Sequence, residues 1–177
     1  LARGATVLRL PMVYGERDLV RREEFILRRV RAGRPRIPIG AGTFLWSRGD
    51  VRDVARAIRL AAESKAGAGQ ALNIAESKTW TIAEWARQIL LAAGSDAELV
   101  RIPDDALPPD MELTAEAAQH MLVSSERARL LLGWSDSDPL ECLRRSVSWH
   151  LDHTPAPGTD DLEADDRALE AAERDWK

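Results

Sequence analysis

The sequence predicts an α/β fold. Short apolar runs with β-branched residues, at about residues 5–14, 37–39, 71–75 and 99–102, have the length and composition of buried strands. Segments with apolar residues on one side and charged residues on the other follow them and predict helices. Glycine, proline or a capping residue separates the two kinds of segment. Strands that alternate with helices along the chain are typical of the α/β class.

Length and composition indicate a globular protein. The chain has 177 residues, 45% of them hydrophobic, which is enough to bury a core. A net charge of −4 and a pI near 5.5 argue against a general nucleic-acid-binding protein. Cys142 is the only cysteine, so one chain cannot form a disulfide, and a reducing, cytoplasmic compartment is expected. No apolar run approaches the roughly 20 residues of a membrane span, and residues 1–4 do not resemble a signal peptide.

The first half of the chain contains clear start and stop signals. The apolar run Ala5–Tyr14 predicts a buried strand that ends at Gly15, and Asp18 precedes a helix that Gly33 and Pro35 terminate. Asp50 is the expected N-cap of a second helix. A short strand is expected at Ala71–Ala75 and at Leu99–Ile102, with a helix from Thr81 to Leu91 between them. That helix should begin with a capping box formed by Thr81 and Glu84.

The second half of the chain predicts two more helices and a tail. Ser124 or Ser125 should cap a helix that ends at Leu132, and Asp138 followed by Pro139 should open a helix that reaches His150. Residues 154–159 are typical of a linker, and the acidic remainder is either disordered or a short solvated helix. We therefore divide the chain into an α/β portion, residues 1–153, and an acidic linker and tail, residues 154–177.

Five segments in family order resemble NAD-dependent epimerases and dehydratases, an atypical branch of the extended short-chain dehydrogenases/reductases. They are Leu8–Gly15, which ends in Val-Tyr-Gly; Val51–Ile58, with a Val-x-Asp-Val-Ala pattern; Leu72-Asn-Ile74; Thr81–Glu84; and Ser124–Trp134, which ends in Leu-Gly-Trp. The helix after Pro139 extends the resemblance, which covers roughly residues 5–153. It implies the C-terminal, substrate-binding part of a Rossmann-type fold, without the nucleotide-binding half.

Two motifs of that family are absent from this sequence. The Gly-x-x-Gly-x-x-Gly turn that receives a pyrophosphate does not occur, and Gly40-Ala-Gly42 resembles it only superficially. The only tyrosine is Tyr14, and Asp18 stands where a catalytic Tyr-x-x-x-Lys pair needs lysine. The resemblance thus implies NAD or NADP in a full-length parent, while this chain alone should bind neither tightly and should contain no catalytic residue.

The resemblance also implies positions for cofactor and substrate. Pro11 and Val13 occupy places beside the nicotinamide ring in the family, although both residues could equally end a buried strand. Met12 stands where many members have an asparagine that binds a sugar, so a more apolar substrate pocket is expected. Trp46 replaces an arginine that often binds the diphosphate of a nucleotide-sugar. Arg48 either takes over that role or is an ordinary surface arginine, and a nucleotide-sugar substrate is therefore doubtful.

Other residues indicate packing rather than chemistry. Four tryptophans lie on or beside helices and are expected in the core or at an interface: Trp80, Trp85, Trp134 and Trp149. The histidines His120, His150 and His153 lack metal-ligand spacing, so no metal site is expected.

Two kinds of partner besides a small-molecule substrate are considered. The Arg-rich stretch of residues 21–36 could contact RNA phosphates, which would make the chain a non-catalytic binding module, as for some RNA-associated plastid relatives. Glu23 and Glu24 within it favour a solvated helix face instead. The strand Ala5–Tyr14 would expose an edge in an isolated chain, which predicts dimerisation or strand exchange.

Overall fold

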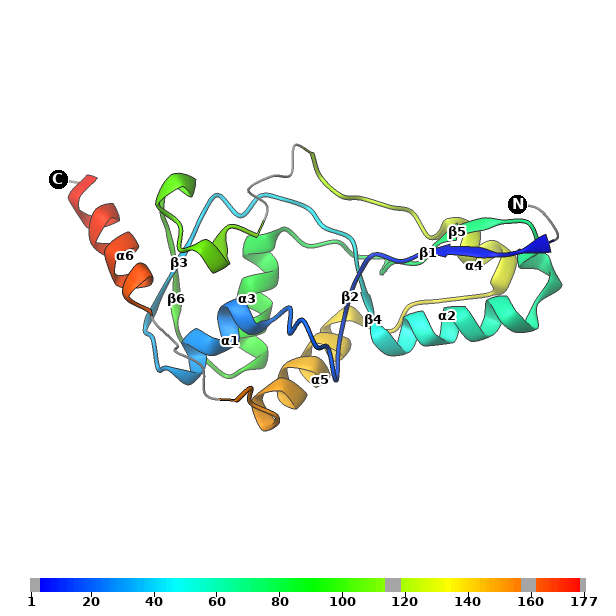
Figure 1. Ribbon diagram of the computed structural model, residues 1–177, viewed down its shortest axis with the longest axis horizontal. Helices are drawn as coiled ribbons and strands as arrows, with labels where there is room; N and C mark the ends of the chain where they lie inside the picture. Colours follow the sequence, from blue (N-terminus) through cyan, green and yellow to red (C-terminus); the bar gives the residue numbers. More distant parts are fainter. Residues whose placement is uncertain (1–3, 114–118, 157–161, 176–177) are drawn as a thin grey trace.

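The computed structural model describes residues 4–113, 119–156 and 162–175, and it has the predicted α/β fold. The molecule is elongated (Figure 1). Strands β1 and β5 with helices α2 and α4 form one end, and β3, β6, α1, α3 and α6 form the other. Strands β2 and β4 lie between them.

The predicted strand Ala5–Tyr14 is divided into two. Strand β1 (Val7–Arg9) pairs in parallel with β5 (Ala71–Asn73), and β2 (Met12–Tyr14) pairs in parallel with β4 (Arg48–Asp50). Pro11 lies in the break, where a ring without an N–H prevents the ladder from continuing. The chain therefore changes pairing partner within one apolar run.

Strand β4 was not predicted, because Arg48-Gly49-Asp50 contains no apolar side chain that would mark a buried strand. All three of its residues are nevertheless buried. A Cβ at Gly49 would lie 3.0 Å from the Pro11 ring, so a glycine allows the two strands to approach closely here. A third parallel pair, β3 (Arg36–Ile39) with β6 (Glu98–Arg101), agrees with the predicted strands at 37–39 and 99–102.

The predicted helix caps are largely confirmed. Helix α2 (Val51–Glu63) begins where Asp50 accepts a hydrogen bond from the Arg52 amide. Helix α3 (Ile82–Ala92) begins where Thr81 Oγ1 accepts from the Glu84 amide at 3.1 Å. The carboxylate of Glu84 bonds Arg87 and Gln88 rather than reaching back, so only half of the capping box forms.

The remaining helices differ from the prediction in detail. Asp18 forms a turn with the amides of Val20 and Arg22, and helix α1 (Glu24–Arg31) begins only after it. Helix α4 (Glu126–Leu132) follows Ser125, whose hydroxyl bonds both the amide and the carbonyl of Ala75 instead of capping the helix. The other predicted cap, Ser124, accepts from the Glu126 amide through its hydroxyl at 3.3 Å. Helix α5 (Pro139–Asp152) begins at Asp138, as expected. Short 3-10 turns occupy Lys65–Gly67, Asp104–Ala106 and Pro109–Met111.

The acidic tail forms a packed helix, α6 (Glu163–Asp175). A helix was one of the two expected alternatives, but the expectation that it is solvated is wrong. Leu162, Ala168, Leu169 and Ala172 are buried, and the Asp165 carboxylate is fully buried against Arg29 of α1. The many acidic residues of this segment predicted a solvated helix, although these apolar residues lie on one face and are buried. The division of the chain at residue 153 stays a prediction.

Three apolar clusters lie along the described part of the molecule, and the smallest joins Ile102 to Ala168 and Ala172 of α6. The other two form the main cores. The larger one joins α1, α3 and α5 with β2 and β3, and its members include Phe25, Ile37, Trp85 and Val147. The second joins α2, α4 and β5 and includes Leu72, Ile74 and Trp134. The predicted core positions of Trp80, Trp85 and Trp134 are confirmed by their burial.

Candidate functional site

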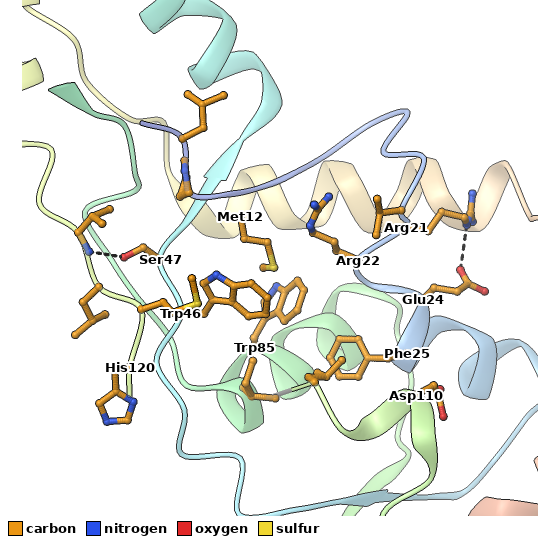
Figure 2. A pocket seen from close by; sticks show the side chains of 18 of the residues that line it. Met12, Arg21, Arg22, Glu24, Phe25, Trp46, Ser47, Trp85, Asp110 and His120 are labelled. Carbon is orange, nitrogen blue, oxygen red and sulfur yellow. Dashed lines mark hydrogen bonds and ion pairs between the residues drawn. The ribbon is translucent and has the colours of Figure 1, made fainter. Parts of the chain in front are cut away.

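A cavity of about 970 Å³ opens where β1 ends and β2 begins. Leu10, Pro11 and Met12 form one side of it, and Trp46 and Ser47, just before β4, form the next. Helices α1 and α3 contribute side chains below, and residues 119–123 complete the rim (Figure 2). Ligands in open α/β folds bind outside the carboxyl ends of the strands, and this cavity begins directly after the carboxyl end of β1.

Aromatic and sulfur-containing side chains line the interior. Met12 is buried at the wall, and Phe25 and Trp85 pack against each other with their ring centroids 5.4 Å apart. The half-buried Trp46 meets Phe44 edge to face at 6.2 Å. Ile82 lies one turn before Trp85 on the same side of α3 and also lines the cavity. Such walls are suited to an apolar or aromatic ligand.

Charged side chains at the mouth of the cavity are paired with one another. Arg21 contacts Glu24 at 3.2 Å and donates to the carbonyl of His153. Arg22 bonds Asp18 at 3.0 Å. Similarly, Arg28 lies 3.0 Å from Asp110. Each of these guanidinium groups already has a carboxylate beside it, which weakens its attraction for an anionic ligand.

The cavity brings together three of the five residues that the sequence analysis placed in the site. Pro11, Met12 and Trp46 line it. Val13 does not: because side chains alternate along a strand, it lies on the other side of β2 and packs against the second core. Arg48 does not line the cavity either.

Arg48 is buried, so its alternative assignment as a surface arginine is wrong. Its guanidinium carbon lies 4.3 Å from the centroid of the Trp85 ring, and Nη1 donates to the Trp80 carbonyl at 3.3 Å. Burial lowers the pKa of Arg48 to about 10, which leaves it protonated at neutral pH. Its Nε and Nη2 atoms have no hydrogen-bond acceptor within the described residues. The sequence could not show this burial, since arginine is rarely buried without an ion pair.

A buried Tyr14–Glu76 pair lies at the end of β2 and was missed from the sequence. The Tyr14 hydroxyl donates to Glu76 Oε1 at 2.7 Å. Burial raises the pKa of Tyr14 far above its usual value, so the phenol does not ionise and is unsuited to general acid–base catalysis. Burial also raises the pKa of Glu76 to about 7. Glu76 follows the short Asn-Ile segment as an ordinary loop residue, and no sequence signal distinguishes it.

A second buried polar group joins α1 to α5. Ser146 Oγ donates to Glu23 Oε1 at 2.7 Å, and His150 Nε2 lies 3.6 Å from Glu23 Oε2 and 3.2 Å from the Gly15 carbonyl. Burial raises the pKa of Glu23 to about 7 and lowers that of His150.

Burial also raises the pKa of the Cys142 thiol, to about 11, which is contrary to a nucleophilic role. No group of residues in the described ranges has the arrangement of a metal site.

The Arg-rich stretch of residues 21–36 is covered by carboxylates. Each of its arginines lies within ion-pair distance of an aspartate or glutamate, among them Asp165, Asp166 and Glu173 of α6. The RNA-binding alternative stays a prediction, and this arrangement leaves less positive charge for phosphates than the sequence alone suggests.

Gly40 and Gly42, which resemble a phosphate-binding turn only superficially in the sequence, lie against neighbouring side chains. A Cβ at Gly42 would lie 2.7 Å from the Ala83 side chain, and one at Gly40 would collide with Asp104 Oδ1. These two glycines therefore allow close packing of their loop against α3 and Asp104. Of the two positions that the family places beside the nicotinamide ring, only Pro11 lies at the cavity wall.

Comparison with protein families agrees with the sequence motifs. Residues 3–75 match the model of the NAD dependent epimerase/dehydratase family. The family recognised from the motifs is thus confirmed for this segment. No curated protein sequence matches the chain. Among the described residues, no helix combines the length and the apolar character that crossing a bilayer requires.

Solved structures confirm a Rossmann-type fold. UDP-glucuronic acid 4-epimerase from Bacillus cereus, in complex with UDP-glucuronic acid and NAD, matches with a TM-score of 0.64 at 20% identity over 84% of this chain. UDP-glucose 4-epimerase from Thermotoga maritima, with UDP-glucose, matches with a TM-score of 0.64 at 22% identity over 84% of the chain. RMD from Pseudomonas aeruginosa, complexed with NADPH, matches with a TM-score of 0.61 at 18% identity over 80%. The chain covers 46% of each of these proteins, and it therefore corresponds to part of their fold.

Proposed function

We propose, from the family match of residues 3–75, that this chain forms the substrate-binding part of an NAD(P)-dependent epimerase, dehydratase or reductase, and that the substrate lies in the cavity beside β2. The observation that carries the proposal is the place of this cavity. It begins after the carboxyl end of a parallel strand, where α/β folds bind ligands, and it includes Pro11, Met12 and Trp46.

In this proposal each site residue has a distinct part. Met12 and Trp46 form apolar walls for the substrate, and Pro11 contacts the cofactor ring in the whole protein. Val13 and Arg48 act from behind the wall: Val13 holds β2 against the second core, and Arg48 supports the Trp85 ring.

The chemistry of hydride transfer would come from NAD or NADP, bound mainly by the rest of such a protein. The chain alone is then inactive, because Tyr14 is bonded to Glu76 and no lysine follows it at the fourth position. A nucleotide-sugar is a poor match for this cavity. Trp46 offers no charge to a diphosphate, and the nearby arginines are already paired.

Calorimetric titration of the chain with three probes tests the proposal: 2-acetylnaphthalene as an apolar carbonyl compound, UDP-glucose as a nucleotide-sugar, and NADPH. We expect binding of the first and no measurable binding of the other two. Trp46→Ala should weaken 2-acetylnaphthalene binding by about 2 kcal/mol, roughly thirtyfold, since aromatic anchors dominate apolar sites. Trp149→Ala, on α5 and outside the cavity, serves as the matched control. Binding that survives Trp46→Ala, or UDP-glucose binding in place of the ketone, would contradict the assignment.

A further inference from the structure

Trp85 is a wall residue of the cavity with an unusual hydrogen-bond state. Its side chain is 2% exposed, and its indole Nε1 has no hydrogen-bond acceptor in the described part of the chain. Buried indole N–H groups normally find a partner. Trp134 shows the normal case, because its Nε1 donates to the Asp53 carbonyl at 2.9 Å. The free donor of Trp85 therefore requires an explanation that packing does not supply.

The surroundings of Trp85 fix its ring in place. The Arg48 guanidinium covers the ring at 4.3 Å, and Phe25 packs against it with 38° between the two ring planes. Met12 is paired in register with Arg48, so both side chains lie on the same side of the β2–β4 ribbon. Figure 2 shows the Trp85 ring rising from α3 toward Met12 and Trp46. The indole is thus held rigidly at the cavity, and a rigid donor favours one ligand geometry.

Arg48 changes the character of this donor. Among the described residues it has no ion-pair partner, yet it is buried and protonated beside the indole. A positive charge over the ring withdraws electron density from it. In a region of low dielectric this makes the N–H group a stronger donor and favours an oxygen with partial negative charge nearby.

We propose that the Trp85 Nε1–H group is a substrate-binding donor that selects a carbonyl or hydroxyl oxygen on an otherwise apolar substrate. The inference rests on the proposed function, because it takes the cavity as the substrate site. Trp85 lines the cavity together with Met12, Phe25 and Trp46, and its single neutral donor matches one neutral oxygen. A carboxylate or phosphate would need unpaired cations, and Arg21, Arg22 and Arg28 are each paired.

A pair of probes that differ only in the oxygen tests this inference. 2-Acetylnaphthalene and 2-ethylnaphthalene have nearly the same shape, and only the first can accept a hydrogen bond. We expect the ketone to bind about tenfold more tightly to the wild-type chain. Trp85→Phe keeps an aromatic ring and removes the N–H, so the ratio of the two affinities should fall to about one. Trp149→Phe is the control and should leave the ratio unchanged, since Trp149 lies outside the cavity.

A spectroscopic measurement on the wild-type chain removes dependence on the stability of the variant. In a ¹⁵N-labelled wild-type protein whose indole resonances are assigned by triple-resonance experiments, the Trp85 N–H resonance should move downfield with the ketone and not with the alkyl probe. The Trp134 resonance should stay in place, because its N–H is already bonded. Equal affinity of the two probes for the wild-type chain, both lost in Trp46→Ala, would overturn the role of Trp85 and leave the substrate cavity standing. Absence of binding by either probe would overturn both.

Discussion

Two glutamates, Glu23 and Glu76, are buried in the core, although within the described ranges neither forms a close ion pair with arginine or lysine. Glu76 accepts from Tyr14, and Glu23 accepts from Ser146. Burial raises the pKa of each carboxyl group to about 7. In the unfolded chain both would titrate near a pKa of about 4.3. The folded protein therefore holds protons on these groups at pH values where the unfolded chain has lost them.

This difference predicts stability that falls as the pH rises. Since the folded state binds more protons between about pH 4.5 and 7, the contribution of Glu76 is complete below that window and is lost through it. Its size is on the order of 3 kcal/mol. His150 acts in the opposite direction below about pH 6.5, because its pKa is lowered. Urea unfolding of the wild type and of Glu76→Gln at pH 5, 6, 7 and 8 separates the contribution of Glu76 to the free energy of unfolding from that of His150.

The Glu76→Gln chain should lose the part of the pH dependence that belongs to Glu76, and it should gain relative to the wild type as the pH rises. The amide oxygen of the substituted side chain would still accept the hydrogen bond from Tyr14, so packing is preserved. Glu63→Gln, at an exposed ion pair on α2, should leave the pH dependence as it is. Parallel curves for wild type and Glu76→Gln would show that Glu76 titrates normally.

The sequence indicated three of the residues that line the cavity, but not their surroundings. Pro11, Met12 and Trp46 were proposed because family motifs fix their place in the chain, and all three line the cavity. Their role in binding substrate or cofactor stays a prediction. Trp85 and Glu76 carry no motif, and their importance depends on which groups surround them in space. A one-dimensional pattern does not contain that information.

At the level of elements, α6 is attached to the molecule by charge as well as by its apolar face. Arg29 is fully buried, contacts Asp165 at 2.6 Å and Asp110 at 2.7 Å, and also donates to the Phe25 carbonyl. Exposed pairs surround this centre, including Arg36 with Glu173 at 2.5 Å.

Arg29→Ala should destabilise the protein by about 3–5 kcal/mol, because it leaves the buried Asp165 carboxylate without a partner. Arg36→Ala removes an exposed pair and should cost less than about 1 kcal/mol. Urea unfolding measures both, and hydrogen exchange should show faster exchange across α6 in Arg29→Ala only. Equal, small effects of the two substitutions would mean that α6 is held by its apolar face alone.

Helix and strand signals differ in how far they determine the fold. Asp50, Thr81 and Asp138 cap the helices as predicted, because an N-cap is a local hydrogen bond between near neighbours in sequence. Strand β4 and the break at Pro11 depend on which distant backbone lies alongside, so the apolar pattern did not reveal them. The charge of α6 predicted a solvated segment. Its burial depends on Arg29, which lies more than a hundred residues earlier in the chain and was therefore not recognisable as its partner.

For the molecule as a whole, the β1–β5 ribbon is incompletely paired. Among the described residues, β1 pairs only with β5. The Val7 amide and the Arg9 carbonyl bond toward β5, so the backbone groups of Leu8 face the other edge. Val7 and Leu10 are exposed. Parallel sheets are normally covered and extended by neighbouring strands, and the chain covers 46% of the Bacillus cereus 4-epimerase that it matches.

We expect the isolated chain to self-associate through this edge of β1. Val7→Lys should shift the association toward monomer, because a lysine at a strand edge opposes pairing. Leu130→Lys, at an exposed position of α4, is the matched control and should not change it. Sedimentation equilibrium over a wide range of concentration distinguishes the two. A wild-type chain that stays monomeric at the highest concentration would show that the Leu8 backbone groups are satisfied by water and that β1 ends the sheet without a partner.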